Sequence, residues 1–446
     1  MRSLFPPFSL VSLFVSLPLI VGFSLTFAGR DAAAADTAPA RELTLDQALS
    51  MAKKSNRNLV AERARLVQAQ VTVDRAWTVL FPTVAAQAKY ARNNIEVGFP
   101  SPKLMRDLTI QPLNQLDAAV SFTLPLLVPA AYPGLKAVNM NERATQENVK
   151  VTENAILFGV AQAFYAAAIA DEVQVARQSS VGVARATVSN AQTRFDAGSV
   201  TKVDVGRAQL ALLRAEQAER EAKLASEQTY RALATLIQTD EPFRVRAAST
   251  PRNAEAAHAS TEDLANVLSL RPEFRAIEAV IKAEEAEKRS HAWRWAPSLS
   301  GFGNARAFNY DNFIGARHSW VLGAQLDWVL YDGGVRDTQR RLAAAQAMES
   351  IARAEVLRDT IRDDLTNGRR QLETKNQAQQ TFERAVELAR ETLELVRIQY
   401  EAGHSTQVDL LQAQDNLVAA QEALAQAHFD VAVADLSLRR AAGTFP

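Results

Sequence analysis

The chain of 446 residues contains no cysteine, and it has only five histidines and five methionines. Without cysteine it can form no disulfide, offer no thiol nucleophile, build no cysteine-ligated zinc site and carry no lipid on a cysteine. The histidine and methionine side chains are scattered singly, which disfavours a soft-metal site. Gly-x-Ser-x-Gly motifs, phosphate-binding glycine loops and histidine–carboxylate clusters are also missing. The sequence therefore predicts a protein that is not an enzyme and that has no cofactor or metal.

An excess of charge of one sign is missing too, since 50 basic side chains balance 50 acidic ones. A net charge near zero gives no reason to expect nucleic acid as a partner. Only the segment Leu4–Phe27 approaches the about 20 apolar residues of a spanning helix. Arg2 precedes this run and small residues follow it, which is the order of a secretory signal peptide. We expect residues 1–35 to be this peptide, with an uncleaved membrane anchor as the alternative.

The sequence does contain an internal duplication. The segment Arg194–Gln209 reappears 205 positions later as Gln399–Gln414. Both copies lie between long segments without proline, so each predicts a tight turn between two long helices. The identical pairs are Ala197/Ala402, Gly198/Gly403, Thr201/Thr406, Val203/Val408, Asp204/Asp409, Ala208/Ala413 and Gln209/Gln414.

A β-hairpin is predicted in each half, because the apolar period changes from about 3.6 to 2 after Pro82 and after Pro297. The clearest alternation of apolar and polar residues runs over 319–330, and its counterpart runs over 116–124. Any contact with a membrane would then be made by strands. Before the first hairpin, the pattern over 44–81 predicts one continuous capped helix.

These signals divide the chain after residue 35 into two structural repeats and a linker. Each repeat is expected to consist of an initial helix, a β-hairpin and a long helical hairpin. Loops are expected inside the β-hairpins near 94–112 and 310–317. The expected bounds are 36–240 for the first repeat (β-hairpin 82–125, helical hairpin 134–238), 241–260 for the linker, and 261–446 for the second repeat (β-hairpin 297–330, helical hairpin 335–440).

A four-stranded antiparallel sheet with one apolar face is incomplete as a single copy. Its edges are unpaired, and in lipid each unsatisfied backbone group costs several kcal/mol. Two copies would give eight strands and a filled interior, whereas three would give twelve strands and room for an aqueous passage. The sequence therefore indicates an oligomeric outer-membrane channel with a long helical extension.

The order of strand hairpin and long helical hairpin, twice over, resembles the outer-membrane efflux protein family of TolC-like exit ducts. The motifs that carry the resemblance span about residues 41–443. They are Leu45-Asp-Gln-Ala48, the helix-to-strand transitions at Pro82 and Pro297, Tyr331-Asp-Gly-Gly334, and the two Ala-Gly-x-x-Thr-x-Val-Asp turns.

The resemblance implies a mixed α/β membrane protein that is a homotrimer. A twelve-stranded barrel would lie in the outer-membrane lipid, and an α-helical barrel would extend on the order of 100 Å into the periplasm. It also implies a periplasmic adapter and an inner-membrane pump as partners, with the chain as a passive exit duct. The alternatives are the outer-membrane channel of type I protein secretion, a periplasmic adapter or scaffold, and a purely structural coiled coil.

The resemblance implies that the two turns are the periplasmic tips that meet the adapter. The alternative for the two glycines is that they only end the helices. The positions expected to dock the adapter are Gly198, Ser199, Val200, Gly403, His404 and Ser405.

A polar stripe begins one turn beyond the second tip, where Asp409, Gln412 and Asn416 share one helical face. Such a stripe suits the lumen of a constricted entrance, although a solvated helix face has the same pattern. We hypothesise that three copies of Asp409 form a ring that selects cations. Asp204 is its counterpart in the first repeat, where an ion pair with Arg207 is expected.

The resemblance implies that this region closes the tunnel. Ser405 and Gln412 stand where some relatives carry an arginine and a second aspartate, so the closing network is expected to differ here. The positions expected at the gate are Asp409, Thr406, Tyr400, Gln412 and Asp204.

Aromatic residues near the ends of the predicted strands are expected to form girdles at the membrane interfaces. The alternative is that some of them pack between strand and helix ends. These residues are Tyr90, Phe122, Trp320, Trp328 and Tyr331.

Overall fold

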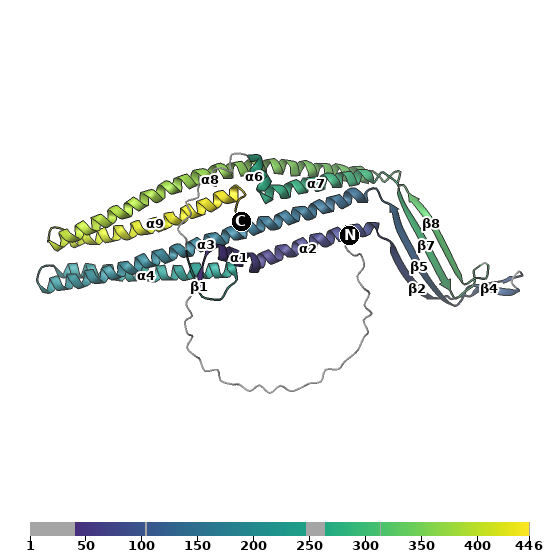
Figure 1. The fold of residues 1–446 in the computed structure, drawn as a ribbon. Helices are drawn as coiled ribbons and strands as arrows, with labels where there is room; N and C mark the ends of the chain where they lie inside the picture. Colours follow the sequence, from purple (N-terminus) through teal and green to yellow (C-terminus); the bar gives the residue numbers. More distant parts are fainter. Residues whose placement is uncertain (1–40, 103–104, 247–263, 313, 446) are drawn as a thin grey trace, which may run out of the picture. The chain divides into compact units, whose positions relative to one another are not determined.

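The computed structural model describes residues 41–102, 105–246, 264–312 and 314–445. The predicted signal peptide at 1–35, and residues 247–260 of the predicted linker, lie outside the described residues. The remainder repeats one order of elements twice (Figure 1).

The first repeat contains two initial helices, two long helices and five strands. Its elements are β1 (Arg41–Leu43), α1 (Leu45–Ser55), α2 (Arg57–Trp77), the 3-10 turn η1 (Thr78–Leu80), β2 (Thr83–Arg92), β3 (Val97–Ser101), β4 (Arg106–Gln111), β5 (Asn114–Leu127), α3 (Ala131–Asp196) and α4 (Lys202–Ile237).

The second repeat follows the same plan with fewer strands. Its elements are α6 (Leu264–Leu270), α7 (Pro272–Trp293), β7 (Ser298–Phe308), β8 (His318–Asp327), α8 (Val335–Glu401) and α9 (Gln407–Ala441), and β6 (Phe243–Val245) lies between the two repeats. α3 and α8 end 205 residues apart, and α4 and α9 begin 205 residues apart. The offset of the sequence duplication therefore applies to the helical hairpins as well as to their turns.

The main sheet has the order β2-β5-β7-β8, and all its pairs are antiparallel. Residues that pair across strands share a face of the sheet. Val84 pairs with Phe122, Val120 pairs with Ala305, and Ala305 pairs with Trp320. The register thus collects the alternating apolar residues of β2, β5 and β8 on one face and most of the polar residues on the other.

Two sequence expectations about the first repeat are wrong. The segment 94–112 is not a simple loop, because β3 and β4 pair within it and Leu108 of β4 is buried. The initial helix does not run unbroken to Phe81. It is interrupted at Asn56, whose side chain caps α2 by accepting from the Asn58 amide at 3.0 Å and donates to the Leu236 carbonyl at 3.1 Å. A contact this distant in sequence leaves no periodic signal.

The long helices α3 and α8 pack against different partners at their two ends (Figure 1). Toward the sheet, α3 lies between α2 and α7, and α8 packs on α7. Toward the tips, α3 packs against α4 and α9, and α8 packs on α9. The order of neighbours is therefore α2-α3-α7-α8 near the sheet and α4-α3-α9-α8 near the tips.

The largest core cluster lies where α1, α3 and α4 meet, and it includes Leu157, Val160 and Phe164 of α3 with Leu233 and Ile237 of α4. Because of this apolar run, α3 is long and apolar enough by length and composition to cross a membrane. The expectation that only the N-terminal run approaches this limit is wrong. The contacts of α3 with α1 and α4 show that its apolar residues form a hydrophobic core between helices.

The first part of the predicted linker is a strand rather than a loop. β6 pairs in parallel with β1, which links the two ends of the first repeat. The hydroxyl group of Tyr230 on α4 accepts a hydrogen bond from the Val245 amide at 3.1 Å and donates one to Asp171 Oδ2 at 2.5 Å. Burial, followed by the hydrogen bond to Asp171, raises the pKa of Tyr230 to about 12.

Candidate functional site

The two turns at the tips have the same backbone geometry. Gly198 (φ +73°) and Gly403 (φ +78°) follow α3 and α8 in the left-handed conformation. The amides of Ser199 and His404 each return a hydrogen bond of 2.8 Å to a carbonyl in the last turn of the helix. A Cβ at either glycine would meet no atom of the described residues within 4 Å. Glycine is therefore favoured by the positive φ and not by lack of space.

The return helices begin with capping boxes. Thr201 and Thr406 are the N-caps of α4 and α9, and Asp204 and Asp409 occupy the third helical position. Asp204 Oδ2 accepts from the Thr201 amide at 3.0 Å and hydroxyl at 2.7 Å. Asp409 Oδ2 accepts from the Thr406 amide at 2.9 Å and hydroxyl at 2.6 Å. Both predicted gate aspartates therefore also cap helices.

The threonine contacts hold both aspartates in the ionised form. The hydrogen bond from the threonine hydroxyl is the main cause that lowers the pKa of Asp204 and of Asp409, and the threonine amide adds to it. Asp204 Oδ1 lies 3.5 Å from Arg207 Nη1, as expected. Asp409 instead accepts a third hydrogen bond, from Ser405 Oγ at 3.1 Å. Among the described residues, no basic side chain forms an ion pair with Asp409.

Tyr400, the third predicted gate residue, is buried by a contact that the sequence did not reveal. The Arg194 guanidinium, on α3, lies 4.6 Å from the centroid of the Tyr400 ring. It also donates to the carbonyl oxygens of Tyr400 at 3.1 Å and Glu401 at 3.2 Å. These carbonyls belong to the last turn of α8, where a cation is stabilised by the helix dipole. Arg194 therefore joins the tips of the two repeats.

The remaining tip positions differ in exposure. Ser199 and His404 are exposed, whereas Val200 and Ser405 are half-buried. Val200, an apolar side chain expected to dock the adapter, is therefore less accessible than the adjacent Ser199. Thr201, the next residue in sequence, begins the capping box of α4.

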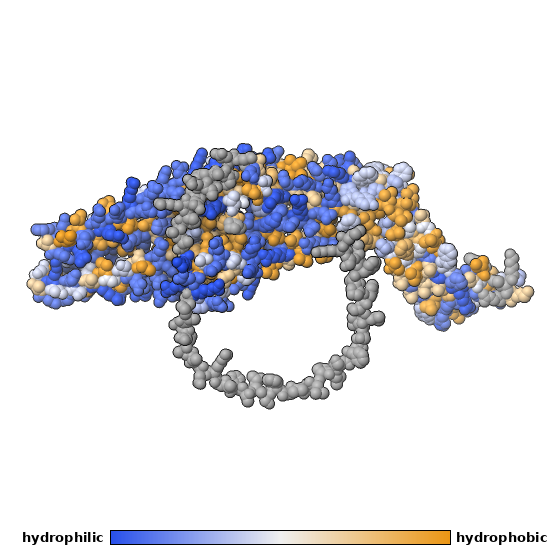
Figure 2. Space-filling view, viewed as in Figure 1, coloured by the Kyte–Doolittle hydropathy of each residue, from blue (hydrophilic) through white to orange (hydrophobic). Residues whose placement is uncertain are grey.

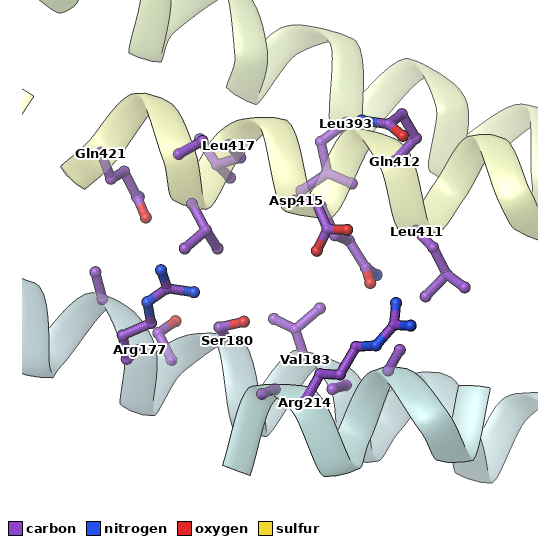
Figure 3. Close-up of a pocket in the computed structure, with 18 of the residues that line it drawn as sticks. Arg177, Ser180, Val183, Arg214, Leu393, Leu411, Gln412, Asp415, Leu417 and Gln421 are labelled. Carbon is purple, nitrogen blue, oxygen red and sulfur yellow. The ribbon is translucent and has the colours of Figure 1, made fainter. Parts of the chain in front are cut away.

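A groove of about 530 Å³ lies between the two helical hairpins (Figure 3). Gln412 lines it and donates to Asn416 Oδ1 at 3.0 Å, so two members of the predicted stripe contact each other. Toward the sheet-side end of the groove, Arg177 of α3 forms a two-pronged ion pair with Glu422 of α9, with Nη2 at 2.7 Å from Oε2. Arg214 and Asp415 also project into the groove (Figure 3).

The predicted girdle aromatics lie at two levels of the sheet. Tyr90 and Trp320 are near the loop ends of β2 and β8, and both are exposed. Trp328 and Tyr331 follow β8 at the helix end and are exposed as well. Phe122 lies on the same apolar face but is half-buried. Eight residues separate Trp320 from Trp328, which is about 27 Å along an extended strand.

The helix end of the sheet carries further aromatic residues, which the sequence pattern had not singled out. Their position just before Pro82 and Pro297, where a helix is followed by a strand, could have identified them. The exposed members are Trp77, Phe81, Trp293 and Trp295. The apolar surface of the sheet is visible beside the more polar surface of the long helices (Figure 2). In the part of the chain that the structure describes, no cluster of three histidine, aspartate or glutamate side chains could hold a metal.

The family model described as outer membrane efflux protein matches residues 48–238 and 264–444, which is most of the chain. The chain belongs to the outer membrane efflux protein family. This family consists of channels and transport ducts, and the match covers both structural repeats. Among relatives, it is similar to the outer membrane efflux protein BepC of Brucella suis, with 24% identity over 67% of this chain and 66% of that protein.

Two further outer-membrane proteins are similar to this chain. The outer membrane protein TolC of Vibrio cholerae is 24% identical over 90% of each chain. The solved structure of VceC, an outer membrane protein of Vibrio cholerae, matches with a TM-score of 0.73 and 17% identity over 90% of this chain and 96% of that chain. The structural match supports a TolC-like fold, with a four-stranded main sheet and two long helical hairpins in the chain.

Proposed function

We propose that three copies of this chain form a passive exit duct in the outer membrane. The duct would conduct substrates from an inner-membrane pump, through a periplasmic adapter, to the exterior. The observation that carries the proposal is the sheet. It has one apolar face, and each of its outer strands, β2 and β8, pairs on one side only within the described residues.

An amphipathic sheet with two such edges is suited to closure with other copies. Side chains on its apolar face are largely exposed in the single copy, including Val84, Trp320 and Leu322. Lipid would cover this face, and pairing of β8 with β2 of the next copy would satisfy the backbone groups of both edges. Three four-stranded sheets give a twelve-stranded barrel, which is wide enough for an aqueous passage.

The helices support the same closure. The outer members of the helical layer are α2 and α8 near the sheet, and α4 and α8 near the tips. One rotation that brings β8 against β2 of the next copy would also bring α8 against α2 and α4 of that copy. Strand and helix layers therefore close by a single symmetry operation, as required of a closed ring.

The aromatic levels support a membrane location for the sheet. The roughly 27 Å of strand between Trp320 and Trp328, tilted by about 40°, corresponds to a height of about 20 Å. Aromatic girdles flank an apolar band of about 25 Å in outer-membrane barrels. The long helices would then extend into the periplasm and present their turns to the adapter.

The tip residues have proposed roles in docking and gating. The exposed Ser199 and His404, with their neighbours in the two turns, would contact the adapter. Asp409 is ionised and has no ion-pair partner among the described residues, so three copies would form an anionic ring at the entrance. Energy for transport would come from the pump, since the family is one of ducts. The name of the BepC relative, an outer membrane efflux protein, supports the same role.

The experiment is to extract the outer-membrane fraction with detergent and measure the protein mass by light scattering, corrected for bound detergent. The expected result is a trimer recovered from that fraction. A soluble periplasmic monomer would overturn the proposal and favour an adapter or scaffold.

A further inference from the structure

The polar face of the main sheet carries its charges unevenly. Its charged side chains within the four strands are Lys89 on β2, Asp117 on β5, Arg306 on β7 and Asp327 on β8. The first three lie in the half of the sheet nearest the loops, whereas Asp327 lies at the helix end. Asp327 pairs with Ser298, which is eight residues from Arg306, or about 27 Å along the strand. Both cations are therefore in the loop half.

Lys89 and Arg306 are cations without a partner in the part of the chain that the structure describes. Both are exposed, and neither forms an ion pair or a side-chain hydrogen bond with a described residue. Asp117 pairs in register with Lys89, but its two oxygens accept from neutral donors, Gln115 Nε2 and the Tyr310 hydroxyl, both at 2.7 Å. Each copy therefore has two cations and one anion in this half of the polar face.

Closure of three copies would space these cations evenly. The strand order around the ring would be β2-β5-β7-β8 in each copy, so β2 and β7 are every second strand. Strands are about 4.8 Å apart, which puts successive cations about 10 Å apart across the ring. Along the strands they differ by about 7 Å, because Asp117, the partner of Lys89, pairs with Phe308, two residues from Arg306. We call the Lys89 and Arg306 side chains of all copies the basic collar.

The charges of the basic collar act together on a solute in the lumen. Their spacing of about 10 Å is close to the Debye length of about 8 Å at physiological salt, whereas Asp327 is about three Debye lengths away. Walls of low dielectric focus such a field into the lumen. Six cations and three Asp117 carboxylates leave three positive charges. An anion with several charges interacts with several cations at once, whereas a monovalent anion does not.

We propose that the basic collar of Lys89 and Arg306 binds polyvalent anions in the exterior half of the barrel, that is, solutes with several phosphate or carboxylate groups. This rests on the proposed trimeric duct. The planar guanidinium of Arg306 can donate to two oxygens of such a group, and Lys89 adds a point charge. Rings of arginine and lysine favour anions in other pores. The exit of the duct then has the opposite sign to the entrance, where Asp409 lies.

The absence of cysteine lets a single introduced thiol report the potential at the collar. Ser319 of β8 is exposed and pairs with Arg306 on the same face. In the closed ring it lies between Arg306 of its own copy and Lys89 of the next. Purified Ser319→Cys trimers in detergent are reacted with two methanethiosulfonates, one carrying a sulfonate and one a trimethylammonium group. The ratio of the two rates, relative to that of a free thiol, measures the local potential.

The expected ratio for Ser319→Cys favours the sulfonate reagent about tenfold, because the collar concentrates anions. Adding Lys89→Gln and Arg306→Gln should bring the ratio to about one. Arg92→Gln is the matched control, since it removes a cation of β2 from the apolar face, and it should leave the ratio unchanged. Tripolyphosphate should slow the sulfonate reaction in Ser319→Cys but not after both cations are removed. Acetate at equal ionic strength should slow it much less.

Two results would overturn the basic collar. One is an equal ratio with and without Lys89 and Arg306, and the other is equal slowing by tripolyphosphate and acetate. Light scattering of every variant shows that a changed ratio comes from intact trimers.

Failure of the collar and failure of the duct are distinguishable. If light scattering gives trimers but the ratio does not depend on Lys89 and Arg306, the collar is wrong and the duct stands. If the protein is a soluble monomer, both are wrong.

Discussion

Arg194 on α3 and Tyr400 on α8 are 206 residues apart in sequence, yet the guanidinium carbon of one lies 4.6 Å from the ring centroid of the other. The same guanidinium donates two hydrogen bonds to the end of α8. The contact joins a cation to an aromatic face and to carbonyls left free at a helix end. It therefore makes the tip of the second repeat depend on a side chain of the first.

Replacing Arg194 by glutamine should loosen the end of α8. Loss of the charge-assisted hydrogen bonds should cost about 1 kcal/mol locally, after allowance for partial exposure. Backbone amides over 400–406 should then exchange with solvent roughly fivefold faster, measured by mass spectrometry. Arg207→Gln, at the exposed pair in the first turn, is the control and should change exchange at 400–406 little. Equal exchange in Arg194→Gln and the parent would show that the contact does not stabilise the tip.

The capping boxes should carry part of the stability of the return helices. Thr201→Ala and Thr406→Ala should each destabilise their helix by about 1 kcal/mol. The folded-state pKa values of Asp204 and Asp409 are lowered, so their contribution is present above the unfolded pKa of about 3.9. It is lost as pH falls through the lower folded value. Unfolding is followed by circular dichroism between pH 3 and 7. The alanine variants should lose less stability than the parent protein as the pH falls.

Removing the charge of Asp409 should reduce cation selectivity. Asp409→Asn keeps an oxygen acceptor for the capping box but removes three charges from the proposed ring. Reversal potentials across bilayers with unequal potassium chloride should shift toward zero. Asp204→Asn is the matched control, because Asp204 already lies beside Arg207. An unchanged reversal potential in Asp409→Asn would remove the selectivity hypothesis.

Opposite faces of β8 should respond differently to lysine. Leu322 lies on the apolar face and Val321 on the polar face, and both are exposed in the single copy. Leu322→Lys would place a charge in lipid at a cost of about 2–4 kcal/mol near the midplane. Val321→Lys would face the lumen and should be tolerated. The two variants are compared by folding each into phospholipid vesicles and measuring the fraction of protein that is protected from protease. Equal protected fractions would contradict the proposed orientation.

Tyr230→Phe should weaken the attachment of β6 and remove one source of alkaline sensitivity. Loss of its hydrogen bonds with Asp171 and Val245 should cost about 1 kcal/mol at neutral pH. The folded pKa is raised to about 12, so the contribution of Tyr230 is complete below the unfolded value of about 10 and is lost as pH rises toward 12. The thermal unfolding temperature should fall less between pH 10 and 12 in Tyr230→Phe than in the parent protein. Exposed Tyr132→Phe is the control and should keep its stability at neutral pH.

Several features could be predicted because they follow local rules. Gly198 and Gly403 end helices by positive φ, and Thr201 and Thr406 begin the next ones by side-chain caps. Strand alternation identified the strands of the main sheet and its apolar face. Roles for Asp409 and the tip turns stay predictions, since their test requires the assembled protein and its adapter.

Other features could not be predicted, because distant contacts decide them. The helix break at Asn56 depends on the Leu236 carbonyl, and β6 forms because β1 lies beside it. The β3–β4 pairing is too short for its alternation to stand out from a loop. Val200 is half-buried, which no single-residue property indicates.

The sequence by itself determined the duplication, the element types and the amphipathic strands, because period, caps and glycine positions act over a few residues. The tertiary structure alone decided which helices are neighbours, and hence that Arg194 meets Tyr400 while the counterpart Gln399 remains exposed. The physical reason is that matching local signals in the two repeats fold into similar hairpins. The side chains on the surfaces of the two hairpins differ, and their contacts are decided only when one hairpin packs against the other.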